Sequence, residues 1–148
     1  MHVVVDDNFF EELEKMLRLI CFRIRVNGRE ALKNYPITPA QFDLLQRLYF
    51  DGPQTMTKLS QILGVAKSTT TGLVTRLERD GFLRRRPSDA DRRVIVVEIT
   101  ELGSEVIKSV INKRVEYIKR VMSNFKNAEA VELFKKLREL YEVIQESR

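Results

Sequence analysis

Residues 59–93 form the most informative segment of the chain and read LSQILGVAKSTTTGLVTRLERDGFLRRRPSDADRR. Residues 55–63 and 67–79 have the apolar spacing of two short helices, and Gly64 between them can supply the positive φ of a tight turn. Two helices joined in this way pack at a steep angle and present the second one outward. The segment therefore predicts a helix-turn-helix, and an ordinary helix pair inside a bundle is the alternative. The side chains expected to face inward are Leu59, Leu63, Val65 and Leu73.

The second of these helices carries an unusual set of polar side chains opposite its apolar positions. They are Lys67, Ser68, Thr69, Thr71, Thr75 and Arg76. Short hydroxyls flanked by cations can bond base edges or phosphates, whereas a merely solvated helix face more typically carries Glu and Lys pairs. Threonine is also a poor helix former, so helix stability does not explain the run. We predict a recognition helix that enters the major groove of double-stranded DNA.

A β-hairpin is predicted directly after that helix. Residues 82–84 and 94–99 are β-branched or aromatic segments, and they flank a polar loop at 87–93. A protruding basic loop beside a recognition helix can follow the phosphates and place an arginine in the minor groove. Asp91 can hold Arg93 by a bidentate bond. A solvated surface turn is the alternative. The predicted DNA contacts of this wing are Arg84, Arg86, Asp91, Arg92 and Arg93.

The remaining segments predict further helices. Their ranges are 8–34, 39–50, 101–125 and 128–144. The first starts at Asn8, with Glu11 closing a capping box. The second has a stronger start signal, because Thr38 and Gln41 have capping-box spacing around a proline. Thr55 and Thr100 can cap the helices that follow them.

In order and spacing these motifs resemble the MarR family of bacterial and archaeal transcription regulators. The similar segments are 59–65, 68–71, 77–83, 91–93 and 99–103, and the wing motif Asp91-x-Arg93 followed by Ile99-Thr100-x-x-Gly103 is fairly specific. The resemblance covers nearly the whole chain. It implies a mainly α fold with a small β-hairpin, in which a winged helix-turn-helix lobe at 37–100 is joined to dimerisation helices at 1–36 and 101–148.

The resemblance also implies a functional arrangement. A homodimer would interlock its first and last two helices and place two recognition helices in successive major grooves of a pseudo-palindromic operator. Such regulators are commonly repressors that a small aromatic acid or an oxidant releases. Two departures from the family pattern predict an altered affinity or sequence preference: Ala66 replaces a capping Ser, and Gly72 replaces a larger, often basic residue.

The dimer is also predicted from apolar residues outside the small winged core. They are Phe9, Phe10, Phe134, Leu137, Leu140, Tyr141 and Ile144. So much apolar surface on terminal helices favours an interface shared by two copies. Packing of these helices within one chain is the alternative.

Cys21 is the only cysteine, so it forms no internal disulfide. Together with Tyr35 it resembles the organic-hydroperoxide-sensing branch of the family, in which a cysteine of this helix is oxidised to sulfenic acid and tyrosines bond its thiolate. Arg25 and Pro39 stand where that branch has its other tyrosines. A buried core cysteine is the alternative.

Composition narrows the function classes. The 148 residues carry 26 Lys and Arg against 21 Asp and Glu, and this excess suits a polyanionic partner. No signal peptide is evident, and the longest aliphatic run, 94–97, is far shorter than a membrane span, so a cytoplasmic protein is expected. With one His and one Cys, we expect no metal, no cofactor and no enzyme. The rival to a DNA-binding regulator is a winged-helix module for protein–protein interaction.

Overall fold

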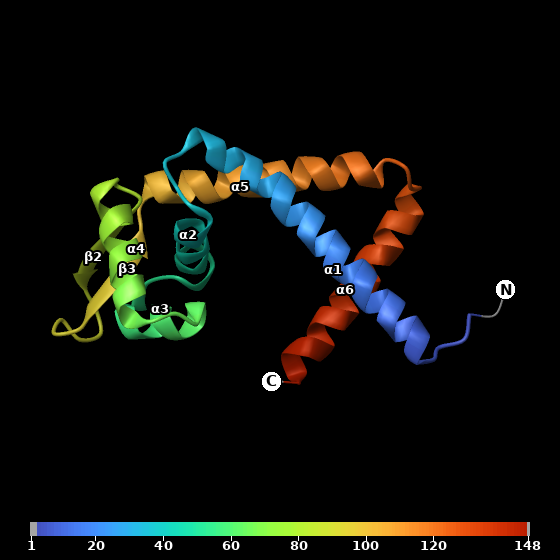
Figure 1. Cartoon of the computed structure of the whole chain (residues 1–148), viewed down its shortest axis with the longest axis horizontal. Coiled ribbons are helices and arrows are strands. Elements are labelled where there is room, and N and C mark those ends of the chain that lie inside the picture. The colour runs from blue at the N-terminus through green and yellow to red at the C-terminus, as the bar shows by residue number, and fades with distance from the viewer. Residues whose placement is uncertain (1–2, 148) are drawn as a thin grey trace. The chain divides into compact units, whose positions relative to one another are not determined.

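The computed structural model describes residues 3–147, and it is mainly helical with one small antiparallel sheet (Figure 1). The predicted fold class is confirmed. The elements are α1 (Asp7–Arg29), the 3₁₀ helix η1 (Glu30–Asn34), α2 (Pro39–Asp51), β1 (Gln54–Thr55), α3 (Met56–Leu63), α4 (Lys67–Arg79), β2 (Leu83–Pro87), β3 (Ile95–Ile99), α5 (Glu101–Met122) and α6 (Asn127–Glu146). They fall into two compact units, one ending at Arg114 and one beginning at Val115, so α5 contributes to both.

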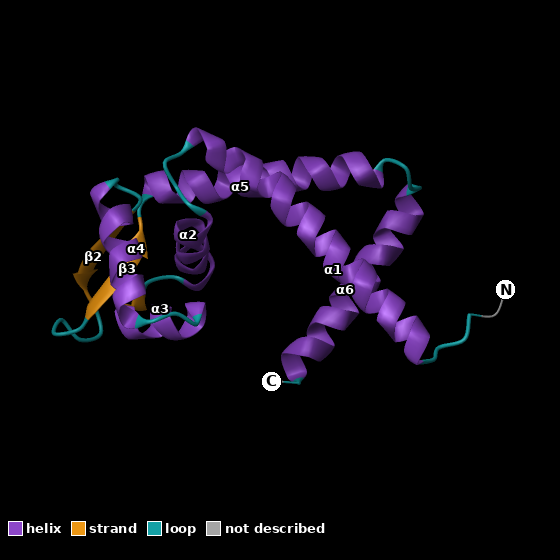
Figure 2. Ribbon diagram, in the orientation of Figure 1, coloured by secondary structure: helices purple, strands orange, loops and turns teal. Residues whose placement is uncertain are grey.

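The first unit holds the hydrophobic core. Buried side chains of α2, α3, α4, the sheet and the start of α5 meet there, and they include Leu44, Leu45, Leu48, Leu59, Val74, Leu77, Leu83, Val97, Val106, Ile107 and Val110. Each large apolar side chain removed from water contributes roughly 1.5–3 kcal/mol. This shared core fixes α3, α4 and the sheet as one body (Figure 2).

Helix starts follow local capping chemistry, with one correction. The capping box of α2 is present: Thr38 Oγ1 accepts from the Gln41 N–H at 3.2 Å, and the Thr38 N–H donates to Gln41 Oε1 at 2.9 Å. The start predicted at Asn8 is wrong, because Asp6 caps α1 by accepting from the Phe9 N–H at 2.9 Å. Asp6 has extended backbone angles, as a capping residue requires, whereas Asn8 already lies inside the helix.

Several predicted boundaries also need correction. The helix predicted over 8–34 is α-helical to Arg29 and continues as η1. The hairpin predicted at 82–99 is confirmed, but β2 extends to Pro87, which can end a strand because the ladder needs no N–H there. A further strand, β1, pairs with β3 and gives the order β1-β3-β2. The helices predicted to end at 125 and 144 end at Met122 and Glu146.

The second unit consists of the end of α5 and of α6. No residue of α6 is buried. Its large apolar side chains are instead exposed, and they include Val131, Phe134, Leu137, Leu140, Tyr141 and Ile144. In the first unit α1 likewise exposes Phe10, Leu13, Met16, Ile20 and Phe22. Each unit therefore has apolar surface that the single chain leaves in contact with water.

Candidate nucleic-acid interface

The joint between α3 and α4 is held by a glycine turn and a buried hydroxyl pair. Gly64 ends α3 with φ of 68°, and its N–H donates to the Ser60 carbonyl at 2.9 Å. The Ser60 hydroxyl donates to Thr70 Oγ1 at 2.9 Å, and Thr70 is fully buried. Because a buried hydroxyl needs a partner, this bond sets α4 against α3 in one orientation.

The inward-facing set of this motif is correct except at one position. Leu59 is buried, and Leu63 and Leu73 are half-buried against the core. Val65 is 39% exposed, so its predicted place in the core is wrong. It follows the left-handed Gly64 in the turn itself, where the chain has left the face that α3 packs inward.

The opposite face of α4 is open to solvent. Thr70, Val74 and Leu77 are its buried residues. The predicted contact residues are all exposed, namely Lys67, Ser68, Thr69, Thr71, Thr75 and Arg76. The N-cap residue Ala66 supplies no side-chain hydrogen bond, as its methyl group dictates. The first turn of α4 therefore keeps backbone N–H groups available to an outside acceptor.

The three consecutive arginines of β2 bond to residues on two different elements, β3 and α4. Alternate residues of a strand point to opposite faces. On one face Arg84 Nε and Arg86 Nε donate to the two carboxylate oxygens of Glu98 on β3, at 2.6 and 2.7 Å. On the other face Arg85 contacts Glu78 and Thr75 of α4. Figure 1 shows β2 beside α4, as the Arg85 bonds require.

Glu98 braces the base of the wing. The hydrogen bond from Arg86, followed by that from Arg84, holds the pKa of its carboxyl below the ordinary value despite the opposing effect of burial. Arg86 is also bonded to the Pro87 carbonyl and lies 3.6 Å from Asp89, and its side chain is only 29% exposed. Arg84 is 68% exposed. Of the two predicted contacts, Arg84 is the more accessible and Arg86 serves mainly to hold the hairpin.

The tip of the wing contains the predicted bidentate pair. Arg93 Nε and Nη2 donate to the two Asp91 carboxylate oxygens at 3.1 and 3.0 Å, and the Arg93 N–H adds a bond at 3.1 Å. These bonds lower the pKa of Asp91. The Arg93 side chain is 90% exposed, so its guanidinium is held in one orientation and remains accessible. Arg92 is exposed and pairs with no acid in the described chain.

The two residues of the predicted redox site are separate in the structure. Cys21 is exposed on α1, eight residues before the helix ends, a distance of about 12 Å along the axis. Tyr35 follows η1 and packs half-buried against the core. No hydrogen bond within residues 3–147 joins the two side chains. Within a single chain Cys21 is not a core residue.

A group of arginines that the sequence did not reveal lies around Arg114 on α5. Its Nε is buried and has no hydrogen-bond partner among the described residues. Burial, together with the charges of Arg29 and Arg25 on α1, lowers the pKa of Arg114, while Asp43 acts in the opposite direction. Its guanidinium lies 5.8 Å from the centre of the Phe42 ring. These residues are distant in sequence, so no local pattern predicts the group.

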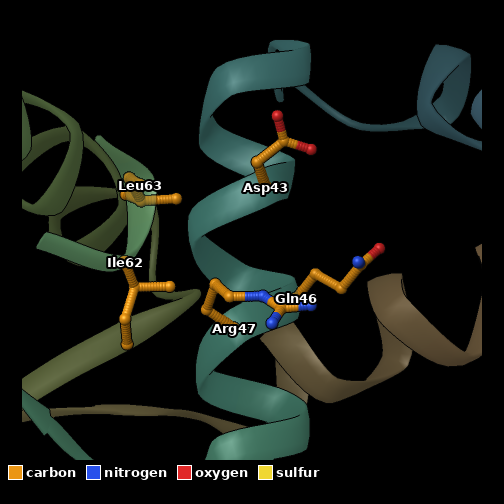
Figure 3. Close-up of a pocket in the computed structure, with 5 residues that line it drawn as sticks. All are labelled: Asp43, Gln46, Arg47, Ile62 and Leu63. Atoms are coloured by element: carbon orange, nitrogen blue, oxygen red, sulfur yellow. The ribbon is translucent and has the colours of Figure 1, made fainter. Parts of the chain in front are cut away.

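A shallow hollow of about 250 Å³ lies between α2 and α3 (Figure 3). Asp43, Gln46 and Arg47 line it from α2, and Ile62 and Leu63 line it from α3. It contains none of the predicted site residues. Residues 3–147 bring together no group of three metal-ligating side chains and include no helix long and apolar enough to cross a membrane.

Comparison with known proteins finds similarity in the part of the chain that carries this candidate interface. The family model described as "MarR family" matches residues 37–95, the segment from α2 to the wing. The chain is 39% identical over 125 residues to the uncharacterized HTH-type transcriptional regulator YsmB of Bacillus subtilis (strain 168), covering 84% of this chain and 85% of that protein.

Two solved structures are similar over nearly the full length. The transcriptional regulator Tm0710 from Thermotoga maritima has 46% identity and a TM-score of 0.82, with 93% of this chain and 96% of that chain covered. A MarR family protein from Bacillus stearothermophilus has 37% identity and a TM-score of 0.83, with 96% and 99% covered.

Proposed function

The chain belongs to the MarR family of winged helix-turn-helix transcriptional regulators, and from that premise we propose that it is a cytoplasmic repressor that binds a pseudo-palindromic operator as a homodimer and is released by a small ligand or an oxidant. The observation that carries the proposal is the exposed polar face of α4 together with the exposed Asp91–Arg93 pair of the wing, both in the first compact unit. A helix of hydroxyls and a pre-oriented arginine on one rigid unit suit a major groove and its neighbouring minor groove.

Individual residues take different roles in this proposal. Ser68, Thr69, Thr71 and Thr75 face base edges, while Lys67, Arg76, Arg84 and Arg92 face phosphates. Arg93 enters the minor groove, with Asp91 fixing its orientation. Arg86 contributes by bracing the hairpin through Glu98.

The homodimer is supported by the apolar surfaces at the chain ends. We assign 1–36 and 101–148 as dimerisation helices and 37–100 as the DNA-binding lobe. The exposed apolar side chains of α1 and α6 would otherwise remain in water, which large apolar patches on soluble proteins rarely do. Sedimentation equilibrium should give twice the 17.3 kDa chain mass, and a monomer at micromolar concentration would contradict the assignment.

The group around Arg114 supports an anionic effector. The positive charges of Arg114, Arg25 and Arg29 and the Phe42 ring 5.8 Å from the Arg114 guanidinium suit the carboxylate and ring of a small aromatic acid. Benzoate should release the wild-type protein from DNA, and Arg114→Met should need much more benzoate for the same release. Equal sensitivity of the two proteins would contradict the effector site.

Cys21 supports the alternative, release by an oxidant, because its side chain is exposed in the single chain and a thiol can be oxidised by a peroxide. Mass spectrometry after mild cumene hydroperoxide treatment should detect the sulfenic acid of Cys21, which gains the oxygen atom that reduces the hydroperoxide to its alcohol. The same treatment should release wild type from DNA and leave Cys21→Ser bound. Release that persists in Cys21→Ser would remove Cys21 from the mechanism.

The main experiment tests sequence-specific binding. The wild-type chain is used to select duplexes from a random pool, and fluorescence anisotropy then compares a selected duplex with an unrelated one at several salt concentrations. We expect a clear preference for the selected duplex and a steep fall in affinity with salt, because several counterions are released. Binding without a preferred sequence or a salt dependence would instead indicate a protein-interaction module.

A further inference from the structure

Arg85 is the only one of the three consecutive β2 arginines that bonds to α4. Its Nη2 donates to the Thr75 hydroxyl at 3.1 Å, its Nη1 lies 3.5 Å from Glu78 Oε1, and its backbone N–H donates to Glu78 Oε2 at 3.0 Å. The Arg85 and Glu78 side chains are each 36% exposed. The charge of Arg85 is therefore balanced within the protein, and its guanidinium is attached to the exposed face of α4.

This contact determines how the Thr75 hydroxyl can bond to anything else. A hydroxyl has one hydrogen to donate and two lone pairs that accept. Arg85 occupies one lone pair, so the Thr75 hydrogen is left for an outside acceptor, and a cationic partner makes the hydroxyl a stronger donor. Thr71 differs, because its hydroxyl donates to the Lys67 carbonyl at 2.9 Å and offers only lone pairs outward.

We propose that Arg85 is a positioning residue for sequence recognition: it orients the Thr75 hydroxyl as a hydrogen-bond donor toward a base acceptor in the major groove, such as guanine O6 or N7. The inference rests on the proposed function, since it concerns DNA bound to α4. Arg85 itself contacts no phosphate. Thr75 then reads an acceptor while Thr71, one turn earlier, reads a donor such as the exocyclic amine of adenine or cytosine.

The salt dependence separates this role from a direct phosphate contact. An arginine that neutralises a phosphate adds about 0.9 to the slope of log affinity against log salt, whereas an arginine already paired with Glu78 does not. Loss of Arg85 should therefore weaken discrimination between sequences and leave the slope unchanged. A structural role alone would lower the melting temperature and weaken all duplexes equally.

The experiment uses the full-length chain, the duplex selected by wild type and an unrelated duplex of equal length. Thr75→Val and Arg85→Met should each reduce the affinity ratio of the two duplexes by about three- to tenfold, the range for one hydrogen bond. The double variant should lose no more than the larger single effect, because both changes remove the same bond. Thr75→Ser and Arg85→Lys, which keep a hydroxyl and a cationic donor, should retain most of the ratio.

Three results would overturn the proposal. A salt slope lowered by about 1 in Arg85→Met would make Arg85 a phosphate contact. Additive losses in the double variant would show that the two residues act separately. An unchanged affinity ratio in either single variant with a normal melting temperature would mean that the bond does not serve recognition. Failure of the proposed function looks different, because the wild type itself would then show no preferred duplex.

Discussion

The close approach of α5 to the base of the wing leads to the sharpest stability prediction. Gly103 lies in the first turn of α5, where its N–H donates to the Thr100 hydroxyl. A Cβ at this position would overlap the Phe82 carbonyl oxygen and would lie 2.6 Å from Cγ1 of Ile99. The Phe82 carbonyl accepts from the Thr100 N–H at 3.1 Å, so it cannot move without breaking that bond. Gly103→Ala must therefore separate α5 from the sheet.

The expected magnitude follows from two opposing contributions. Overpacking a tight site costs typically 1–3 kcal/mol, and more where backbone has to shift. Alanine recovers up to about 1 kcal/mol of helix propensity. Since the clash involves backbone, we expect a net loss of about 2 kcal/mol in the free energy of unfolding. For a chain of this size that loss lowers the melting temperature by several degrees.

Gly72→Ala is the matched control. Gly72 lies in the middle of α4, and a Cβ there would meet nothing within 4 Å. The same chemical change should therefore stabilise the protein by up to about 1 kcal/mol. Thermal denaturation followed by circular dichroism, at equal chain concentrations, measures both variants. Equal melting temperatures for the two variants, or a Gly103→Ala protein as stable as wild type, would refute the close approach of α5 to Phe82 and Ile99.

Three further changes test the N-cap of α4, the contact of Glu98 with Arg84 and Arg86, and the arginine at the tip of the wing. Ala66→Ser should stabilise the protein by about 1 kcal/mol in thermal denaturation, because the backbone of Ala66 already has the extended angles of an N-cap, and no gain would mean that the α4 N-terminus has another partner. Glu98 has a lowered pKa, so its contribution to the free energy of unfolding is complete above the ordinary value of 4.5 and is lost as pH falls below it. In urea titrations from pH 7 to 3, Glu98→Gln should therefore lose less stability than wild type, and equal losses would contradict the stabilising role of Glu98. Arg93→Ala should weaken binding to the selected duplex by about tenfold or more in anisotropy titrations while sedimentation still shows a dimer, and wild-type affinity would exclude the wing contact.

Features encoded by neighbouring residues were predictable. The helix-turn-helix, the capping box at Thr38, the left-handed Gly64 and the Asp91–Arg93 pair each depend on side chains within a few positions of one another. The α1 start was mispredicted for a related reason. Asp6 and Asn8 are both good capping residues two positions apart, and Glu11 gave Asn8 a false second partner. The two-residue β1 is too short to show the alternation of apolar and polar residues by which a strand is predicted.

Features that depend on the assembled fold were not predictable. Strand alternation alone places Arg84 and Arg86 on one face. The register that pairs Arg84 with Glu98 depends on where the loop between β2 and β3 begins and ends. Which face of β2 meets α4 depends on the packing of the whole first unit, so the role of Arg85 could not be assigned from its neighbours. Arg114 lies against Phe42 and Gly28 only after α1, α2 and α5 have come together.

Hydroxyl-radical footprinting of the selected duplex measures whether α4 and the wing bind DNA together. We expect two protected half-sites about one helical turn apart, with protected minor-groove sugars beside each. In Arg93→Ala the minor-groove protection should disappear while the half-sites remain protected. A wild-type footprint without minor-groove protection, or one that Arg93→Ala leaves unchanged, would mean that Arg93 does not enter the minor groove.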